Sequence, residues 1–540
     1  MSSVADLVID GLRKLGIDTL FCLPGVQNDD FFDRLVDARD IRPIVARHEQ
    51  GAAYMAMGYA QASGGPSACS VVPGPGMLNA SAALTSAYWG NARVLAVVGQ
   101  LHTWALGRSW GVLHDLPDQS AILDQLTKHN ELITDPAAAA GQIQTAIDYL
   151  VSGRPRPVSI EVPVDVWSQP AELTLKAAVA TKPTLDTEAV ERAAAALDRA
   201  ERPLVVVGGG AQDASIEVTE LVEKLGAPVT TRRMGHGVVP TSHPMYVPLP
   251  VARDLWRTAD LVLAIGTRIE FPLLHWGFDD DLTLVKIDVD FDELDRHGAT
   301  AIGIHGDAAE ACGALIGTIA DRPQVDDPVA DLDERRRAFR EEIDHLRPQL
   351  DYLGAIRDVL PDDGVIVEDV TQIGFAAHLA FPFTRPRTFL SSGPAGTLGA
   401  AFPTGLGAKV ALGDRALLTI SGDGGFMFGA TELATAVQHD IAAVTLVFND
   451  GAFGNVKRLQ QNRFGPDRTI VSDLVNPDLM AFTASFGALG IRVDSPDELR
   501  SALERAFAHG GPVIVEARVG PMPDPWPYLR MGRVRGEPHY

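Results

Sequence analysis

The chain has 540 residues, of which 46% are hydrophobic and 21% are charged, and its formal net charge is −24. This composition is typical of a soluble globular protein with about three domains, and the strong negative charge argues against nucleic acid or an anionic membrane as a partner. The three cysteines are too few and too scattered for a disulfide framework or a zinc site.

The chain divides into three blocks in which short apolar strands alternate with Ala-rich helices. The first block begins with an amphipathic helix rather than a signal peptide, and no stretch is apolar for the ~18 residues of a membrane span, so we expect a cytoplasmic protein. Such alternation predicts an α/β fold with three doubly wound parallel-sheet domains. The predicted domains cover residues 1–168, 188–322 and 345–522, followed by a proline-rich tail at 523–540.

Three further features mark the connections between these blocks. Residues 167–187 are rich in Pro, Lys and Thr and predict a linker, and a charged helix is predicted over residues 331–346. Glycine-rich turns at residues 70–76 and 391–399 each precede an Ala-rich helix. A shared need of two parallel-sheet domains for tight, glycine-rich strand-to-helix turns is enough to explain this echo between the first and third blocks.

Two acidic residues of the third block follow apolar strands that are predicted over residues 416–420 and 443–448. These residues are Asp423 and Asp450, and because the carboxyl ends of parallel strands meet at one edge of a sheet, we expect them to lie side by side. Carboxylates are ligands that Mg²⁺ prefers, and the backbone carbonyl of Ala452 is a natural third protein ligand. A metal ion that holds a phosphate is therefore the first hypothesis.

The glycines that follow the first aspartate support this hypothesis. Gly424 and Gly425 carry no side chain where the backbone must approach a ligand, and a helix predicted from Phe428 onward would point its N-terminus at the same place. Free N–H groups and the helix dipole there favour a phosphate. A plain turn explains most isolated runs of this kind, so the later pair Asn449 and Asp450 carries the prediction.

With these motifs the chain resembles the thiamine-diphosphate-dependent enzymes of the acetolactate synthase, 2-oxoacid decarboxylase and benzaldehyde lyase group. The family motif is GDG followed by roughly twenty-six residues and two asparagines, and here Asp450 replaces the second asparagine. The substitution keeps a ligand oxygen and adds a negative charge, which should tighten metal binding. The resemblance covers about residues 3–520 and implies a pyrimidine-binding domain, a central modified Rossmann domain and a diphosphate-binding domain.

The family also has a glutamate in the first domain, after a short strand and before a helix rich in Ala and Gly. Residues 44–53 supply it as Glu49. By the resemblance, Glu49 hydrogen-bonds N1′ of the cofactor's aminopyrimidine and so promotes loss of the proton at C2 of the thiazolium ring. Taken alone, a glutamate beside a histidine and an arginine is more often part of a surface ion pair.

Other cofactor contacts follow from the same resemblance. The carbonyl of Gly396 corresponds to the acceptor of the 4′-amino group, and Leu398 to the apolar wedge that forces the two rings into a V, although in isolation it would be assigned to the core. Thr371 and Gln372 fit a second diphosphate-contacting turn. The implied cofactor-binding residues are Gly396, Leu398, Thr371, Gln372, Gly424, Gly425 and Asn449.

The pocket above C2 differs from that of simple decarboxylases. Where decarboxylases of this group often carry a proton-relaying Asp or Ser, this chain has Val26, followed by Gln27 and Asn28, and the decarboxylase histidine pair is not evident. A decarboxylase that releases an aldehyde needs a proton donor. Its usual donors are missing here.

A second group of pocket residues precedes a Thr-Lys-His segment. His114 and Asp115 stand where acetolactate synthases have Phe-Gln. His114 is the best candidate for a general acid or base, with Asp115 either polarising it or binding substrate hydroxyls. The alternative is a loop pair that faces solvent.

The acceptor site of acetolactate synthases is also not matched, because Pro272 and Leu459 stand in place of its Arg and Trp. Around the metal loop, Asn455 suggests a substrate with a hydroxyl or second carbonyl. The central block has no GxGxxG fingerprint, so FAD or another nucleotide is possible there but not predicted. The residues expected to line the pocket are Val26, Gln27, Asn28, Phe453, Asn455, Val456 and Leu459.

We therefore expect a Mg²⁺- and thiamine-diphosphate-dependent C–C lyase or carboligase that acts on a 2-oxo acid or a 1,2-diketone. The alternatives are a diketone hydrolase or an FAD-linked oxidase of the same family, and, in another class, an inactive structural or regulatory relative. In this family the glutamate-bearing domain of one subunit meets the diphosphate-bearing domain of another. A homodimer is therefore required, and a homotetramer of two such dimers is expected.

Overall fold

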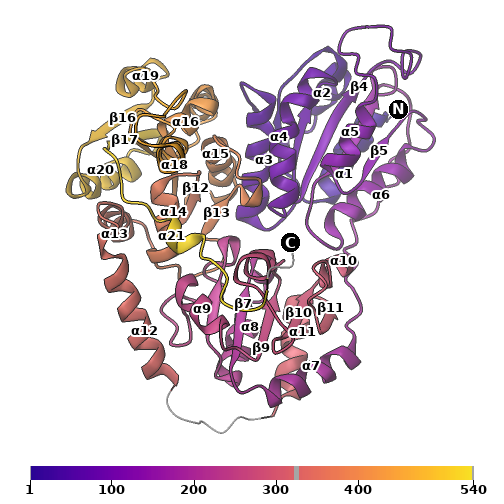
Figure 1. Ribbon diagram of the computed structural model, residues 1–540. Coiled ribbons are helices and arrows are strands. Elements are labelled where there is room, and N and C mark those ends of the chain that lie inside the picture. The colour runs from indigo at the N-terminus through magenta and orange to yellow at the C-terminus, as the bar shows by residue number, and fades with distance from the viewer. Residues whose placement is uncertain (1, 321–327, 538–540) are drawn as a thin grey trace.

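The computed structural model of the protein describes residues 2–320 and 328–537. These residues form three α/β domains, each built around its own parallel sheet and placed at the corners of a triangle (Figure 1). The predicted fold class is confirmed. The expected limits at residues 1, 322 and 540 lie outside the described residues. Of the helices that are described, none combines the length and the apolar character needed to cross a membrane.

The first domain contains a six-stranded sheet in the order β2-β1-β3-β4-β6-β5. Its inner strands are continuous runs of buried residues because helices and their apolar side chains cover both faces. The strands are β1 Thr19–Cys22, β2 Arg42–Val45, β3 Ser67–Val71, β4 Val94–Gln100, β5 Asn130–Leu132 and β6 Val158–Pro163. The helices are α1 Val4–Lys14, η1 Val26–Asn28, α2 Asp29–Leu35, α3 Glu49–Ser63, α4 Pro75–Trp89, α5 Gln119–Leu126 and α6 Ala139–Val151.

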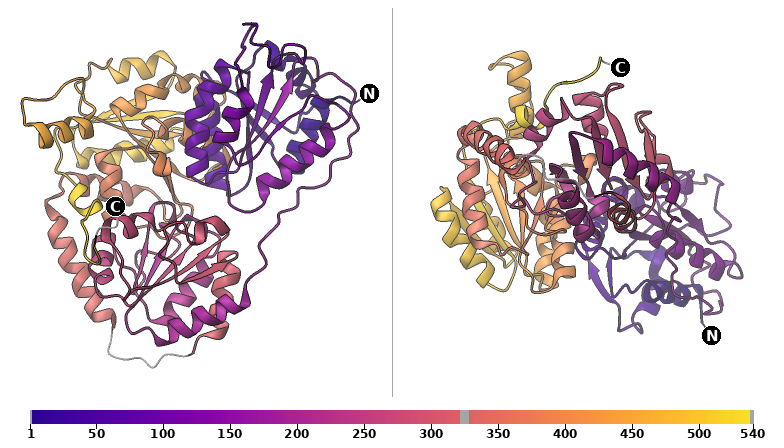
Figure 2. Two further views of the ribbon diagram at one scale, coloured as in Figure 1. Left: turned by 45° about the vertical axis from the view of Figure 1, so that its right-hand side comes forward. Right: turned by 90° about the horizontal axis from the view of Figure 1, so that it is seen from below.

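A segment without helices or strands, residues 164–186, leads to the central domain, close to the predicted linker (Figure 2). The central sheet has five strands in the order β11-β10-β9-β7-β8. The strands are β7 Pro203–Val207, β8 Val229–Thr231, β9 Leu261–Ile265, β10 Thr283–Asp288 and β11 Ile302–His305. The helices are α7 Thr187–Arg199, η2 Gly209–Ala211, α8 Ser215–Leu225, η3 Arg233–Gly235, α9 Leu249–Trp256, η4 Pro272–Trp276, α10 Phe291–Leu294 and α11 Ala308–Thr318.

The charged helix predicted over 331–346 is α12 Pro328–Glu342 followed by η5 Ile343–His345, and it leads into the third domain. The third sheet has six strands in the order β13-β12-β14-β15-β17-β16. The strands are β12 Val365–Glu368, β13 Phe389–Ser391, β14 Leu417–Gly422, β15 Val444–Asn449, β16 Leu489–Val493 and β17 Val513–Arg518. The helices are α13 Gln349–Val359, α14 Gln372–Ala380, η6 Gly393–Ala395, α15 Ala401–Leu412, α16 Asp423–Gly429, η7 Ala430–Glu432, α17 Leu433–Gln438, α18 Gly454–Phe464, α19 Leu479–Ser485, α20 Pro496–Ala508 and α21 Trp526–Leu529.

One helix start differs from its prediction. The helix expected from Phe428 onward begins at Asp423, directly after β14, and short helical segments continue it to residue 438. The glycines at positions 424 and 425 suggested a loop because glycine weakens a helix. Tertiary contacts override that preference here, since both glycines are buried.

Helices α3 and α15 join the first and third domains at very close range. A Cβ at Gly58 of α3 would lie 2.0 Å from the carbonyl oxygen of Thr404, and a Cβ at Gly407 of α15 would lie 1.8 Å from that of Met55. Only glycine permits these approaches of helix to backbone. Each helix therefore contributes one glycine to the contact.

The C-terminal segment crosses from the third domain back to the central domain (Figure 1). Near its start Asp524 pairs with Arg458 of α18 at 3.2 Å. Near its end the backbone N–H of Val534 donates to the carbonyl of Trp276 at 2.9 Å, and Arg535 pairs with Asp279. We call residues 519–537 the C-terminal strap.

Candidate functional site

In the first domain, Glu49 is the first residue of α3. The side chain of His48 accepts from the N–H of Gln50 and so caps this helix. The side chain of Asn79 donates to Glu49 Oε2 at 3.0 Å and orients the carboxylate. Within the described residues, the other oxygen of Glu49, Oε1, has no hydrogen-bond partner.

The loop that carries His114 lies against the turn between β3 and α4. A Cβ at Gly74 would lie 2.4 Å from the carbonyl oxygen of His114, so Gly74 allows this contact. His114 has a positive φ of 66°, and its Nδ1 is buried without a hydrogen-bond partner. Asp115 accepts from the N–H of Gly111 at 2.8 Å rather than from the imidazole. This contact disfavours Asp115 as the group that polarises His114 and leaves it to meet a substrate.

The three residues after Pro24-Gly25 divide into one exposed and two buried side chains. Val26 is 62% exposed at the edge of the sheet. Asn28 is fully buried and donates to the carbonyl of Val71 at 3.0 Å, and the carbonyl of Gln27 accepts from Trp167. The side-chain oxygens of Gln27 and Asn28 are buried without a hydrogen-bond partner, so the place of these residues in the pocket stays a prediction.

In the third domain, Asp423 and Asp450 lie at the carboxyl ends of neighbouring strands β14 and β15, as predicted. Burial and the negative charge of Asp450 raise the pKa of Asp423 to about 6, and burial raises the pKa of Asp450. Two carboxylates that repel each other in a buried place favour a cation between them. The side chain of Asn476 donates to Asp423 at 2.5 Å and fixes one oxygen.

The turn from Gly396 to Gly399 is held by a buried carboxylate, Asp369. Gly396 and Gly399 both have positive φ, 58° and 82°. Asp369 accepts from the N–H of Gly399 at 3.1 Å and from the hydroxyl of Ser421 at 3.0 Å, and a Cβ at Gly425 would lie 2.4 Å from it. Burial raises the pKa of Asp369 to about 6. Leu398 is partly exposed in this turn, a position open to a ligand.

A second turn begins α14. The hydroxyl of Thr371 caps this helix by accepting from the N–H of Gly374, and the side-chain oxygen of Gln372 is buried without a partner. A Cβ at Gly424 would lie 2.6 Å from the ring of Phe453, so only glycine allows this ring to pack against the turn. The glycines, the start of α14 and the unsatisfied side chain of Gln372 fit a diphosphate held by a metal.

Other residues near the metal loop already have partners. Asn449 donates to Glu516 at 2.7 Å and accepts from the N–H of Gly451, so it shapes the turn that carries Asp450. Ala452 is buried beside that turn. Asn455 accepts from the indole of Trp526 at 2.8 Å and from Arg458, which engages it with the C-terminal strap rather than with open space. Val456 and Leu459 are 49% and 52% exposed on α18.

The chain thus carries two half-sites on different domains. The first half-site is formed around Glu49 and His114, and the second around Asp423, Asp450 and the turn at Gly396. Within the described residues no hydrogen bond or ion pair joins Glu49 to the second half-site. Nor do those residues contain a cluster of three or more His, Cys, Asp or Glu side chains that could hold a metal, so the two aspartates need oxygens from elsewhere.

Four residues with a part in these half-sites were not anticipated from the sequence. Each lies 30 or more positions from its partner in the chain, so local sequence patterns do not indicate the contact. A polar residue directly after a strand was the available indication for Asp369 alone, which follows β12. The four residues are Asn79, Asp369, Asn476 and Glu432.

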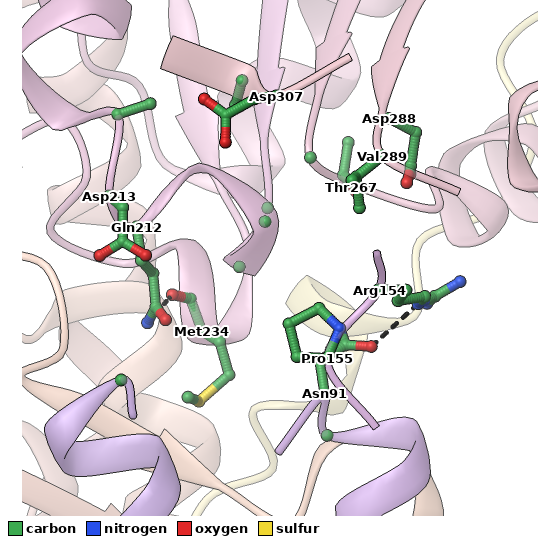
Figure 3. Close-up of a pocket in the computed structure, with 18 of the residues that line it drawn as sticks. Asn91, Arg154, Pro155, Gln212, Asp213, Met234, Thr267, Asp288, Val289 and Asp307 are labelled. Carbon is green, nitrogen blue, oxygen red and sulfur yellow. Dashed lines mark hydrogen bonds between the residues drawn. The ribbon is translucent and has the colours of Figure 1, made fainter. Parts of the chain in front are cut away.

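A separate cavity of about 310 Å³ lies between the domains, at the carboxyl ends of the central strands (Figure 3). Asp288 is the last residue of β10 and Asp307 follows β11, and on the opposite side of the cavity Arg154 Nε donates to Asn91 at 2.9 Å. Burial lowers the pKa of Arg232 to about 10, and one of its nitrogens has no partner. The cavity lies at the position where α/β sheets generally bind ligands.

Comparison with known proteins places this geometry in a family. The N-terminal thiamine pyrophosphate binding domain of thiamine pyrophosphate enzymes matches residues 2–122, the central domain matches 190–315, and the C-terminal thiamine pyrophosphate binding domain matches 369–517.

Similar proteins over nearly the full length carry two kinds of name. The probable 2-ketoarginine decarboxylase AruI of Pseudomonas aeruginosa is 34% identical over 94% of this chain and 92% of its own length. The large subunit of acetolactate synthase isozyme 1 of Escherichia coli is 28% identical over 99% and 97%. The probable acetolactate synthase large subunit of Methanocaldococcus jannaschii is 29% identical over 96% and 92%. The chain belongs to the thiamine-diphosphate-dependent enzymes, of the decarboxylase and acetolactate synthase type.

Proposed function

We propose that the protein is a Mg²⁺- and thiamine-diphosphate-dependent C–C lyase or carboligase whose donor substrate is a 2-oxo acid or a 1,2-diketone. The observation that carries the proposal is the pair Asp423 and Asp450 at the ends of adjacent strands. Its complement is a carboxylate, Glu49, at a helix N-terminus on the first domain. An inactive structural relative would have no need to keep both.

The residues that would hold the cofactor lie in the metal loop and the turns of the third domain. Asp423, Asp450 and the carbonyl of Ala452 would bind Mg²⁺. The residues for thiamine diphosphate would be Gly396, Leu398, Thr371, Gln372, Gly424 and Gly425, with Asn449 supporting the metal turn. When bound, thiamine diphosphate supplies a carbon that attacks a carbonyl and then accepts the electrons of the breaking C–C bond.

The chain's own contribution is to hold and move protons. Glu49 lies at the N-terminus of α3, with one oxygen fixed by Asn79 and the other without a partner among the described residues, so it can hold a hydrogen bond to the pyrimidine nitrogen. His114 has an unpartnered buried Nδ1 and is therefore the candidate for exchanging a proton with a bound substrate. Replacing His114 by Ala should lower kcat while cofactor affinity stays the same, and an unchanged kcat would assign the proton transfer to another group.

For the substrate, we favour a 2-oxo acid with a polar or cationic side chain. Asp115 has one carboxylate oxygen bound by Gly111, and the exposed Asp118 follows on the same loop. A relative is named as a probable 2-ketoarginine decarboxylase. The test is a panel of 2-ketoarginine, pyruvate, benzoylformate and a cyclic 1,2-diketone, with products identified by mass spectrometry. Asp115→Asn should lower kcat/KM for the cationic substrate more than for pyruvate, and an equal fall for both would reject this specificity.

We propose a homodimer in which the first half-site of one subunit meets the second half-site of its partner, with a homotetramer as the expected full assembly. Exposed apolar side chains support this, including Trp110 and Leu113 beside the first half-site and Val456 and Leu459 beside the second. Glu49→Gln and Asp423→Asn proteins, each inactive alone, should regain activity after subunits are mixed and re-equilibrated. Mixed dimers that remain inactive would show that the half-sites belong to the same subunit.

For the central cavity, we propose a nucleotide as occupant, without a specific case for FAD. The guanidinium of Arg232 stacks on Phe271 at 4.4 Å and has one nitrogen without a hydrogen-bond partner, which suits a phosphate, and Asp288 at the end of β10 suits a ribose hydroxyl. Visible flavin absorbance of the purified protein would identify FAD. Mass spectrometry of the denatured protein would reveal any other nucleotide.

A further inference from the structure

A carboxylate of the third domain contacts the segment that leads into Glu49. Glu432, the last residue of η7, is 1% exposed. Its oxygens accept from the backbone N–H of Arg47 at 3.1 Å and from that of His48 at 3.0 Å. The hydroxyl of Thr435 donates to it at 2.6 Å. Arg47 and His48 are the two residues directly before α3, so Glu432 bonds the backbone that places Glu49.

The rest of this segment is also bound by the third domain. The N–H of Val45, on edge strand β2, donates to His439 Nε2 at 3.0 Å, and the side chain of Arg42 donates to the carbonyl of His439 at 2.6 Å. The edge of a sheet presents N–H groups that need partners. Here the strand before Glu49 finds them on another domain, so its position depends on that domain.

The carboxylate of Glu432 is closely packed against the first turn of α3. A Cβ at Gly51 would lie 2.1 Å from Glu432 Oε1, so only glycine in the first turn of α3 admits the carboxylate. Burial raises the pKa of Glu432. A buried carboxylate is costly unless it is fully hydrogen-bonded. Glu432 therefore requires the two backbone N–H groups and Thr435 as partners. Its hydrogen bonds to the N–H groups hold the start of α3 against the third domain.

Glu432 also belongs to the chain segment that begins at the metal site. Asp423 opens α16, and Glu432 follows nine positions later (432 − 423), through α16 and η7. Asp423 and the residue that bonds the start of α3 thus lie on one continuous helical segment of the third domain.

We propose that Glu432 is a positioning residue for Glu49. It fixes the N-terminus of α3 and thereby the direction of the Glu49 carboxylate, and it links that direction to the state of the metal-bearing helix. The proposal rests on the proposed role of Glu49. In the proposed dimer, Glu49 and Asp423 of one chain serve different active sites, so the same bond would couple the two sites.

The first test is amide hydrogen exchange, followed by mass spectrometry, on the protein without cofactor. Glu432→Gln puts an NH₂ group in place of Oε2, which accepts from the Arg47 N–H at 3.1 Å and from the Thr435 hydroxyl, so the Arg47 amide should exchange about tenfold faster. Thr435→Val, which removes one donor to Glu432, should act in the same direction and more weakly. Unchanged exchange across residues 44–52 in a folded variant would overturn the proposal, whatever the protein catalyses.

The second test follows exchange of the C2 proton in bound thiamine diphosphate. Glu432→Gln should slow it about tenfold or more, with cofactor affinity little changed, and Glu432→Asp should give an intermediate rate. In a Glu49→Gln background the same change should have no further effect, because Glu432 acts through Glu49. Additive losses would indicate general damage and reject the positioning role.

The matched control is Glu293→Gln in the central domain. Glu293 is also 1% exposed, and it accepts from Arg154 at 2.8 Å. Its loss should lower stability while both exchange rates remain at the wild-type level. If Glu49→Gln itself leaves C2 exchange unchanged, the proposed function fails, whereas the amide exchange still decides the contact made by Glu432.

Discussion

The first and third domains have the same sheet topology and different chemistry. Numbered within each domain, both sheets run in the strand order 2-1-3-4-6-5. In the third domain, strands three and four are followed by Asp423 and Asp450. In the first domain, the same strands end at Val71 and Gln100, and the acid follows strand two instead, as Glu49. The scaffold is shared, and under the proposed function the residues at the carboxyl ends of its strands decide which half binds Mg²⁺ and which half handles a proton.

The same comparison explains how the halves are joined. Helices α3 and α15 each follow the second strand of their domain, and each places one glycine against the backbone of the other, Gly58 and Gly407. Equivalent helices thus meet through equivalent contacts. The two domains are therefore joined by helices that occupy corresponding places in their folds.

The largest expected effect tests the first domain. Glu49→Gln should slow C2 proton exchange in bound thiamine diphosphate by about 10²–10⁴-fold, because a neutral amide no longer favours the required proton on the pyrimidine. Cofactor affinity should stay within about tenfold of the wild-type value, since the proposed metal and diphosphate contacts lie on the third domain. Proton exchange is read by quenched-flow NMR, and an unchanged rate would remove Glu49 from its role.

The corresponding change in the third domain should have the opposite pattern. Asp423→Asn should weaken binding of Mg²⁺ and thiamine diphosphate by at least about 100-fold, because a lost ligand costs no less than a lost outer contact. Titration calorimetry measures both affinities. Asp467→Asn, an exposed aspartate beyond α18, is the control and should bind normally. Normal binding by Asp423→Asn would show that the two edges do not divide their roles in this way.

The third prediction concerns a substitution that disrupts the contact between helices α3 and α15. Gly407→Ala should lower the free energy of unfolding by about 3 kcal/mol, because its Cβ would overlap the Met55 carbonyl and force the helices apart. Chemical denaturation measures the loss. Gly313→Ala, on the exposed side of α11 with no atom within 4 Å of the new Cβ, should instead be neutral or stabilise by about 0.5–1 kcal/mol. Equal effects would mean that the close approach is not needed.

The smallest expected effect concerns the acid that supports the third-domain turns. Burial raises the pKa of Asp369 to about 6, from an ordinary value of 3.8. Between these values the folded protein binds more protons than the unfolded chain, so this contribution to stability is present at low pH and is lost as pH rises through 6. Relative to Asp369→Asn, the cofactor-free wild type should therefore gain a few degrees of Tm between pH 7 and pH 5. A parallel Tm curve for the variant would contradict the assignment.

The positions of Asp423 and Asp450 in the third sheet could be predicted because each follows a run of apolar residues. Both lie at the carboxyl ends of strands, as these runs indicated. The helix start was misplaced, since GDGG resembles a loop until packing is known. The glycine-rich echo was also misleading: residues 70–76 follow the third strand of their domain and residues 391–399 the second, so the two turns are not equivalent.

The supporting contacts could not be predicted, because they join residues that are distant in the chain. Asn455 was expected to line the pocket from its place beside the metal loop, and its contact with Trp526, 71 positions later, was not anticipated. Glu432 bonds residues 384 and 385 positions away. Such contacts depend on how the domains pack, which local sequence patterns do not predict.

Because of the C-terminal strap, the three domains are connected to one another by more than the interdomain linkers. The first domain is joined to the third by α3 and α15, and the third is joined to the central domain both by α12 and by the strap, which ends against Trp276 and Asp279. A single nick by a protease in residues 164–186 would therefore leave every fragment bound to the others. The nicked protein should migrate intact in a native gel and separate only in denaturant, which makes this linker a place for insertions.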